Sequence, residues 1–248
     1  ARGFGLPPAL GVGLMLLAAS PGGPTANLFS HLAKGDVALN ITLTATNCLL
    51  SLFTLPFVVN YSLEAFYGAG KSIPLQFDKI LQVFALVLVP VSIGMLVHAK
   101  KPAVAQKIER PVKIASTLFL VLIIIAAVIK ERANLAESFQ QVGLACLVFN
   151  LTSMAVGYVV PIILRLPQRQ APAIGMEVGI HNGTLAITIA SSPILLNNTT
   201  MSIPAAIYSL IMYFTAGAFA SFMARKNVDV DASAQSPKAA ANESTPAS

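Results

Sequence analysis

The sequence predicts an all-α polytopic membrane protein. Hydrophobic residues make up 55% of the 248-residue chain and charged residues only 10%, whereas a soluble domain carries about 25% charged residues. Long runs contain no Asp, Glu, Lys or Arg, and they approach or exceed the ~20 residues with which a helix spans a bilayer. These runs are Val37–Leu63, Ile80–Val97, Ile114–Ile129, Ser138–Leu164 and Val178–Ala224.

The first of seven expected membrane segments, Leu6–Ala33, is predicted to be interrupted. Its middle holds Ser20-Pro21-Gly22-Gly23-Pro24. Two prolines and two glycines in four positions remove hydrogen-bond donors and favour non-helical backbone. In lipid, the freed backbone groups must be satisfied by protein, water or ions. The break is therefore a candidate ion site, although a Pro-kinked helix or a short hairpin would have the same sequence.

The second segment, Val37–Asn60, begins after Asp36, which is a favourable helix N-cap. Its first turns carry Asn40, Thr44 and Asn47 at i, i+4 and i+7 spacing, so these side chains share one helix face. Oxygen-bearing side chains on one face can line a cation site. Hydroxyls that bond to their own helix backbone would give the same pattern, and the sequence leaves both interpretations open.

The continuous segments that follow are expected to include a kink at Pro90. Their predicted bounds are Phe77–His98, Val112–Ile129, Ser138–Leu164 and, at the end of the membrane domain, Met201–Ala224. Residues 227–248 are rich in Ala, Ser, Asn and Pro and lack apolar periodicity, so this tail is expected to be disordered.

The sixth segment, Ala173–Ser191, is predicted to break near Gly179–Gly183, where glycines and polar residues interrupt the apolar pattern. Apolar helices broken in this way are typical of transporter sites. Two five-helix halves related as an inverted repeat would place the two breaks at matching positions. The first segment would then be the fourth helix of its half, so three further helices are expected before Ala1.

Glu177 lies beside this second break. It is the only acidic residue in the 55 residues 170–224, which contain no Lys or Arg. An ionisable side chain inside the membrane is costly and marks a functional site by default. His181 and Asn182, about one turn away, are further candidates. A protonated or paired structural glutamate is the alternative interpretation.

The loop charges predict the orientation in the membrane. When the loops are assigned alternately, ten basic residues lie on one side and five on the other. The larger set is Lys34, Lys100, Lys101, Lys107, Arg110, Lys113, Arg165, Arg169, Arg225 and Lys226. The positive-inside rule places this set in the cytoplasm, which predicts a multi-pass protein of the cell (inner) membrane with a cytoplasmic C-terminus.

Two function classes are not expected. The basic residues lie between apolar runs and form no patch, so the net charge of +6 does not indicate a nucleic-acid partner. The sequence contains no P-loop, dinucleotide-binding fingerprint or zinc-ligand spacing, so an enzyme is not expected either.

These residues resemble the bile acid:sodium symporter family. The motifs that carry the resemblance are Pro21-Gly22-Gly23 with Asn27, Leu32–Leu39, and Glu177-Val178-Gly179 with Asn182. The resemblance covers Leu6–Ala224. It implies an inverted-repeat transporter of the sodium/proton antiporter-like fold, with two broken crossing helices and seven of ten helices present. Within a membrane domain of residues 1–226, a core (3–60 and 138–224) would move against a panel (77–129).

The resemblance also implies two sodium sites and a neighbouring substrate site. The residues expected to bind sodium are Asn27, Asn40, Thr44, Glu177, Val178, Ile180 and His181. The residues expected next to the substrate are Pro24, Thr25, Asn182 and Gly183. Glu177 would serve both sodium sites, and the second would use the backbone carbonyls of Val178 and Ile180. Asn40 replaces a residue that is commonly hydroxyl-bearing, and His181 stands where a glutamine is usual.

The implied activity is sodium-coupled symport of a small organic anion across the lipid bilayer by alternating access. Bile acids, pantoate and 2-oxo acids are all compatible substrates. The first alternative is a sodium/proton antiporter-like exchanger, which would need a pair of titrating acids where the spans offer only Glu177. Related arsenite permeases expect a cysteine before the first-break proline, where this chain has Ala18, Ala19 and Ser20. A membrane scaffold would leave Glu177 unexplained. For His181 the sequence leaves open a proton-exchanging role and a purely hydrogen-bonding one.

Overall fold

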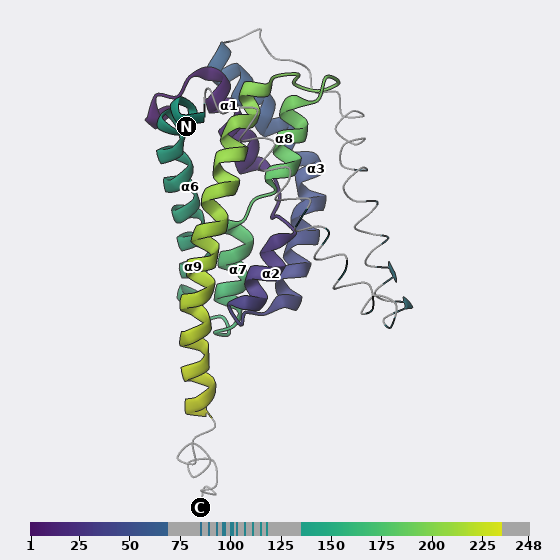
Figure 1. The fold of residues 1–248 in the computed structure, drawn as a ribbon, viewed down its shortest axis with the longest axis vertical. Coiled ribbons are helices and arrows are strands. Elements are labelled where there is room, and N and C mark those ends of the chain that lie inside the picture. The colour runs from purple at the N-terminus through teal and green to yellow at the C-terminus, as the bar shows by residue number, and fades with distance from the viewer. Residues whose placement is uncertain are drawn as a thin grey trace, which may run out of the picture. The chain divides into compact units, whose positions relative to one another are not determined.

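The computed structural model describes residues 1–68 and 135–234, together with isolated positions between 85 and 118. In these ranges the chain is helical apart from turns and one isolated β-bridge (Figure 1). The helices are α1 (Pro8–Ala19), α2 (Thr25–Leu32), α3 (Val37–Tyr67), α6 (Leu135–Ile163), α7 (Gln170–Gly179), α8 (Gly183–Ser191) and α9 (Ile203–Ala234), with 3-10 turns η1 (Arg2–Phe4) and η2 (Thr199–Ser202). The predicted spans Phe77–His98 and Val112–Ile129, and with them the panel, lie outside the two described ranges.

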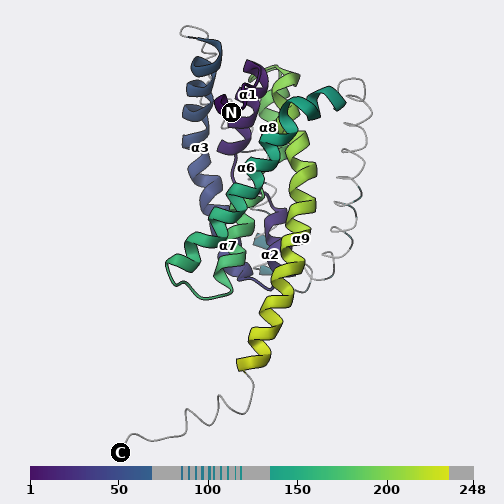
Figure 2. The same cartoon turned by 90° about the vertical axis from the view of Figure 1, so that its left-hand side faces the viewer.

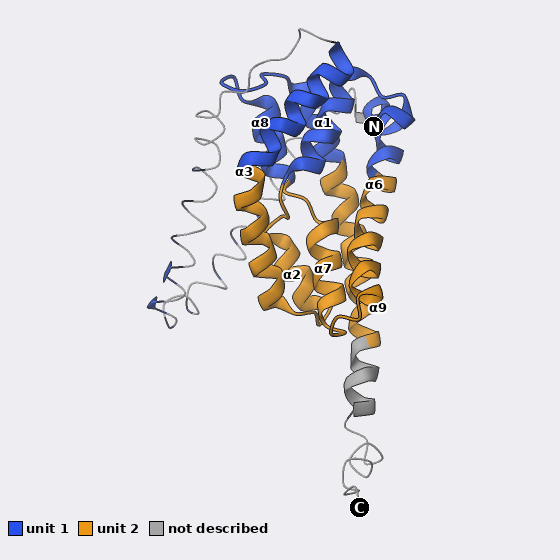
Figure 3. Ribbon diagram, turned by 180° about the vertical axis from the view of Figure 1, so that it is seen from behind, with its two compact units in different colours: residues 1–20, 52–146, 183–207 blue, residues 21–51, 147–182, 208–248 orange. Residues whose placement is uncertain are grey.

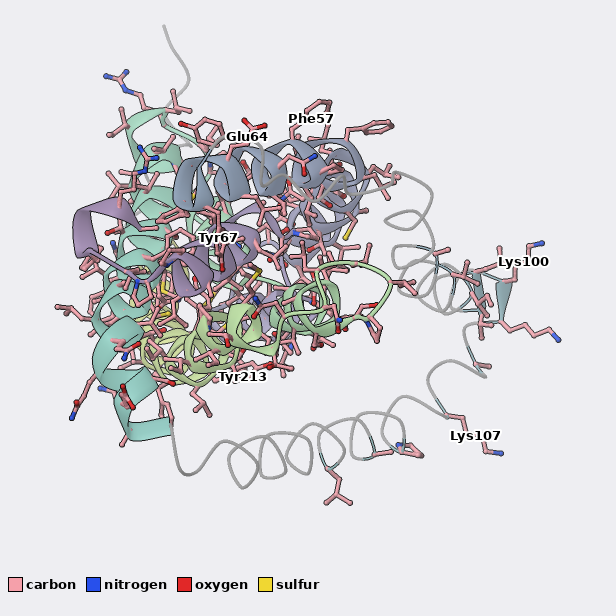
Figure 4. All side chains as sticks on the ribbon, turned by 90° about the horizontal axis from the view of Figure 1, so that it is seen from above. Phe57, Glu64, Tyr67, Lys100, Lys107 and Tyr213 are labelled. Carbon is pink, nitrogen blue, oxygen red and sulfur yellow. The ribbon has the colours of Figure 1, made fainter. Side chains whose placement is uncertain are left out.

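Three helical stretches in the described residues are long and apolar enough to cross a membrane: Val37–Tyr67, Ala136–Ile163 and Thr199–Lys226. Their large apolar side chains are widely exposed. Phe57 of α3 is 76% exposed, and its ring extends outward from the helix (Figure 4). Such exposure is unfavourable in water and costs nothing against lipid tails. The described part of the chain is therefore that of a polytopic membrane protein, as predicted.

Two predicted helix ends are wrong. The second segment was expected to end at Asn60, but α3 continues to Tyr67 and stops before Gly68, whose φ is +92°. The last segment was expected to end at Ala224, but α9 continues to Ala234, through the first residues of the predicted tail. Both extensions lack Gly and Pro, so the backbone hydrogen bonding of the helix persists where the apolar pattern stops.

Both predicted breaks are present. The first separates α1 from α2 and the second separates α7 from α8. The two broken stretches run antiparallel and pair through their backbones: Gly23 N donates to Ile180 O at 2.7 Å, and Asn182 N donates to Pro21 O at 2.9 Å. This pairing, with its bridge between Gly22 and His181, satisfies backbone groups that the interrupted helices leave open.

The chain divides into two compact units (Figure 3). The first unit comprises residues 1–20, 52–146 and 183–207, and in it α1 and α8 both pack against η2. The second unit comprises residues 21–51, 147–182 and 208–248, and in it α2 packs side by side with α7 (Figure 2). The paired breaks belong to the second unit.

The second unit is also held together where α2 turns into α3. Asp36 caps α3 as predicted, because its Oδ1 accepts from Leu39 N at 3.0 Å. Its own backbone N donates to Arg169 O at 2.8 Å, just before α7 begins. This turn therefore fixes the start of α3 against the start of α7, and the first turns of the two helices run together toward the breaks.

Candidate functional site

The Glu177 carboxylate is the centre of the site. It lies in the last turn of α7 and is only 3% exposed. Thr44 Oγ1 donates to its Oε2 at 2.6 Å, and Asn47 Nδ2 donates to its Oε1 at 3.0 Å. Both donors come from α3 and both are neutral. In the part of the chain that the structure describes, no charged side chain bonds to this carboxylate. A buried carboxylate held by neutral donors retains its affinity for a cation.

Gly22 of the first break packs against this carboxylate. A Cβ atom at Gly22 would lie 2.1 Å from Glu177 Oε1 and 2.4 Å from its Cδ. A side chain at this position would displace the carboxylate. This close approach explains why residue 22 is a glycine. It also brings Glu177, in the second broken helix, into contact with the backbone of the first broken helix.

The predicted polar face of α3 is confirmed, because its three side chains all bond to α7. Besides Thr44 and Asn47, Asn40 donates from Nδ2 to Ala173 O at 2.7 Å. The alternative interpretation also holds in part. Thr44 lies within hydrogen-bond distance of the Asn40 carbonyl of its own helix as well as of Glu177, and on the other face Thr42 and Thr46 bond only to carbonyls of their own helix. Asn47 was not among the expected sodium ligands, although its helical spacing was a signal for it.

Two carboxamide oxygens of the second unit have no hydrogen-bond partner among the described residues. Asn27 Oδ1 and Asn40 Oδ1 are buried and accept no hydrogen bond. Leaving a buried acceptor unsatisfied costs about 1–3 kcal/mol, so a native structure is expected to place an ion or a water against it. Carboxamide oxygens are ligands that hard cations prefer. Both residues were predicted from the sequence, although no hydrogen bond joins Asn27 to Glu177.

A second polar network surrounds the second break and was missed in the sequence. Asn150 Nδ2 and Tyr208 Oη both donate to the carbonyl of Gly179, at 3.0 and 2.8 Å. The His181 ring stacks on Phe149, with centroids 5.1 Å apart, and meets the Tyr208 ring edge-on at 5.5 Å. A signal existed: Asn150 is the only asparagine in the apolar run 138–164, and a carboxamide inside a membrane helix requires partners.

The remaining predicted residues flank the breaks. Ile180 is the first residue beyond α7, and its carbonyl accepts from Gly23, while Val178 is in the last turn of that helix. The four residues expected next to the substrate are distributed over both units: Pro24, Thr25 and Asn182 belong to the second unit, and Gly183, the first residue of α8, belongs to the first unit. Their common role stays a prediction.

Comparison with known proteins gives consistent matches. A model of the sodium bile acid symporter family matches residues 1–138. The P3 protein of Homo sapiens is 29% identical over 189 residues, which are 76% of this chain and 39% of that protein. The ileal sodium/bile acid cotransporter of Oryctolagus cuniculus is 26% identical over 187 residues, 75% of this chain and 53% of that protein. The uncharacterized sodium-dependent transporter YocS of Bacillus subtilis is 24% identical over 226 residues, 91% of this chain and 68% of that protein.

The chain matches only part of the length of these relatives, and this limits what can be inferred from them. The chain spans 39% of the P3 protein and 53% of the ileal cotransporter. An activity of the whole protein therefore has to be argued from the residues of the site.

Proposed function

Since the chain belongs to the sodium bile acid symporter family, we propose that it carries the ion site of a sodium-coupled symporter for a small organic anion. One observation carries the proposal: the buried Glu177 carboxylate is held by the neutral donors Thr44 and Asn47. A bound cation would supply the missing positive charge. The printed names of two relatives, a sodium/bile acid cotransporter and a sodium-dependent transporter, agree with sodium as that cation.

The first sodium ion would bind among Asn27, Asn40, Thr44 and Glu177. Thr44 Oγ1 lies 2.6 Å from Glu177 Oε2 and 3.0 Å from Asn40 O, so its single hydrogen has two acceptors. When sodium enters, the hydroxyl would turn its hydrogen to Asn40 O and present a lone pair to the ion. The unsatisfied oxygens of Asn27 and Asn40 would complete the set.

The second sodium ion would bind on the other side of Glu177. Its ligands would be the carboxylate, the backbone carbonyls of Val178 and Ile180, and a nitrogen of His181. The carbonyl of Ile180 already accepts from Gly23 N and keeps a second lone pair. The imidazole is placed by stacking on Phe149 and by an edge-on contact with Tyr208, which would reduce the entropy lost when the ion binds.

Sodium and substrate would be coupled through the paired breaks. The helix α2 begins at Thr25, so the positive end of its dipole faces the first break. An organic anion would bind there, next to Pro24, Thr25, Asn182 and Gly183. Sodium at Glu177 would order the backbone around Gly22, because the carboxylate lies against that glycine. Substrate binding would then be favoured by bound sodium, as alternating-access symport requires.

The repeated arrangement of elements supports the inverted-repeat fold. A helix broken into two halves is followed by a long helix twice in the described chain: α1 and α2 precede α3, and α7 and α8 precede α9. Both breaks would then be the crossing point of the core, which would move against a panel of residues 77–129.

Contacts between basic segments of the second unit support the orientation that the loop charges predict. The turn after Lys34 bonds to Arg169 O through Asp36 N, so two loops of the predicted cytoplasmic set meet at one end of this unit. Lys226 donates to Tyr158 Oη at 3.1 Å, which places the last basic pair of α9 beside the final turns of α6. We therefore keep this end, and the C-terminus, on the cytoplasmic side of the cell membrane.

An exchanger of sodium for protons is the second candidate, and the site favours it less. Such an exchanger would need a second acid that titrates together with Glu177. The side chains that bond to Glu177 are a hydroxyl and a carboxamide, and the sequence around them, residues 37–63 and 170–224, contains no other acid.

The deciding experiment uses the complete protein, purified and reconstituted. A panel of bile acids, pantoate and 2-oxo acids is screened for thermal stabilisation in sodium and, as the control, in potassium at equal ionic strength. At least one anion is expected to stabilise the protein only in sodium, and its uptake into vesicles should follow an inward sodium gradient. Stabilisation that is equal in both salts for every anion would contradict sodium-coupled symport.

A further inference from the structure

The carbonyl of Gly179 is the point at which α7 stops being a helix. In a continuous helix this oxygen would accept from the backbone N–H four residues later. The chain instead turns into an extended conformation at Ile180, with φ −110° and ψ 96°. The carbonyl is satisfied by two side chains from two other helices, Tyr208 of α9 at 2.8 Å and Asn150 of α6 at 3.0 Å.

These two side chains form a closed and buried network. Asn150 Nδ2 also donates to Tyr208 Oη at 3.1 Å, and Thr215 Oγ1 donates to Asn150 Oδ1 at 2.6 Å. Asn150 and Tyr208 are both fully buried. Every polar atom of the Asn150 carboxamide therefore has a partner, and a network satisfied in this way is rigid and specifies one conformation.

Tyr208 contacts the break at two places. Its hydroxyl bonds to the end of α7, while its ring meets the imidazole of His181 edge-on. Phe149, the neighbour of Asn150 on α6, stacks on that imidazole and also contacts the Tyr208 ring, with centroids 5.5 Å apart. The same pair of helices thus fixes both the last helical carbonyl and the side chain in the middle of the broken stretch.

The network opposes closure of the break. If α7 and α8 joined into one helix, the carbonyls of residues 178–181 would bond within that helix. The backbone bonds that join the two breaks, from Gly23 N to Ile180 O and from Asn182 N to Pro21 O, would then be lost. Tyr208 and Asn150 already satisfy the Gly179 carbonyl in the open break. Closure would therefore gain no hydrogen bond at this carbonyl, so the two donors stabilise the open break relative to a continuous helix.

We propose that Tyr208 and Asn150 are positioning residues of the transporter, which hold the second break open and so determine its apparent affinity for sodium. The proposal rests on the proposed sodium coupling. Sodium binds the open break, and the apparent dissociation constant rises as the populated fraction of that state falls. Weakening the network should therefore raise the half-saturating sodium concentration and leave the maximal uptake rate unchanged at saturating sodium.

The test compares Tyr208→Phe with Tyr158→Phe in the reconstituted full-length protein. The first variant keeps the ring that contacts His181 and removes only the hydroxyl. The second removes the hydroxyl that accepts from Lys226 Nζ, about two helical turns from Asn150. The half-saturating sodium concentration should rise about threefold to tenfold in Tyr208→Phe, as expected for one hydrogen bond in a membrane protein, and should stay within twofold of wild type in Tyr158→Phe.

Amide hydrogen exchange provides a readout that does not depend on transport. The N–H groups of Gly23 and Asn182 bond across the breaks, so their exchange without sodium should be about threefold to tenfold faster in Tyr208→Phe than in wild type or Tyr158→Phe. If wild type shows no sodium dependence, the proposed function fails, and the exchange result still decides whether the network holds the break.

Substitution of Thr215 gives a second route if Tyr208→Phe does not insert. Thr215→Val removes the donor to Asn150 Oδ1, whereas Thr215→Ser keeps it. The valine variant should shift sodium affinity and exchange in the same direction as Tyr208→Phe, and the serine variant should restore wild-type values. Unchanged exchange at Gly23 and Asn182 in both Tyr208→Phe and Thr215→Val, or a lowered maximal rate with unchanged sodium affinity, would overturn the proposal.

Discussion

The carboxylate of Glu177 rests against Gly22, with only 2.1 Å between its Oε1 and the position that a Cβ on Gly22 would occupy. The two residues are 155 positions apart in the chain, and each belongs to one of the two broken helices. Through this contact, we expect a change in the charge state or ligation of the carboxylate to alter the backbone of the first break.

A methyl group at Gly22 should disrupt the site. We expect Gly22→Ala to lower the unfolding free energy by about 1–3 kcal/mol, as overpacking does, and to abolish sodium-dependent uptake, because the carboxylate must move. Thermal unfolding and uptake by the purified variant measure both effects. Gly217→Ala is the matched control, since a Cβ there meets no atom within 4 Å. Equal behaviour of the two variants would show that the close approach has no consequence.

Removal of the charge on Glu177 should uncouple transport from sodium. Glu177→Gln keeps the shape of the side chain, so the protein should still insert. Loss of one member of a buried charge pair costs about 3–5 kcal/mol, so the apparent sodium affinity should fall by at least about a hundredfold. Sodium titration of uptake and of thermal stability measures the change. Sodium-driven uptake of wild-type size in this variant would be incompatible with the proposed role.

Two threonines of α3 offer a matched comparison. Thr44 donates to Glu177, whereas Thr46 bonds only to the carbonyl of Thr42. We expect Thr44→Val to reduce sodium affinity about tenfold or more, because a hydrogen bond to a charged group contributes about 1.5–3 kcal/mol. Thr46→Val should change it less than twofold. Sodium-dependent uptake distinguishes the two, and a similar loss in both variants would point to a general effect on the helix instead.

The predicted orientation can be tested by cysteine labelling. In a background without Cys48 and Cys146, a cysteine placed within Lys100–Gln106 should react with an impermeant maleimide only from the cytoplasm. One placed within Gly68–Ser72 should react only from outside, since the positive-inside rule sets the direction. Labelling with the opposite sidedness at both positions would reverse the assignment.

Two loops that are joined by a hydrogen bond in the second unit allow a second labelling test. The bond from Asp36 N to Arg169 O requires the turn at Lys34 and the loop before α7 to lie on the same side of the membrane. Cysteines at Lys34 and Gln168 should therefore label from the same side as each other and as Lys100–Gln106.

Local chemistry made much of this structure predictable. Proline and glycine act on their own segment of backbone, so Pro21-Gly22-Gly23-Pro24 predicted the first break without knowledge of any partner. Asp36 predicted the start of α3 because a cap bonds only three residues ahead. The isolation of Glu177 in a long apolar sequence pointed to the centre of the candidate site, since the cost of a charge in lipid does not depend on the fold.

Helix ends were less predictable than breaks. The sequence pattern reports where apolar character stops, and this marks a membrane boundary. A helix, however, ends where its backbone hydrogen bonding ends. For α3 this is Gly68 and not Asn60, and α9 runs on to Ala234.

By itself, the sequence determined which segments are apolar, where two of them break and which acid lies among them, because each of these depends on residues that are close along the chain. Only the tertiary structure decided which side chains reach which groups. Helical spacing placed Thr44 on one face of α3, but its bond to Glu177 joins residues 133 positions apart. Asn150 and Tyr208 reach the Gly179 carbonyl from two different helices. Such contacts depend on how helices distant in sequence pack, which no local pattern of residues encodes.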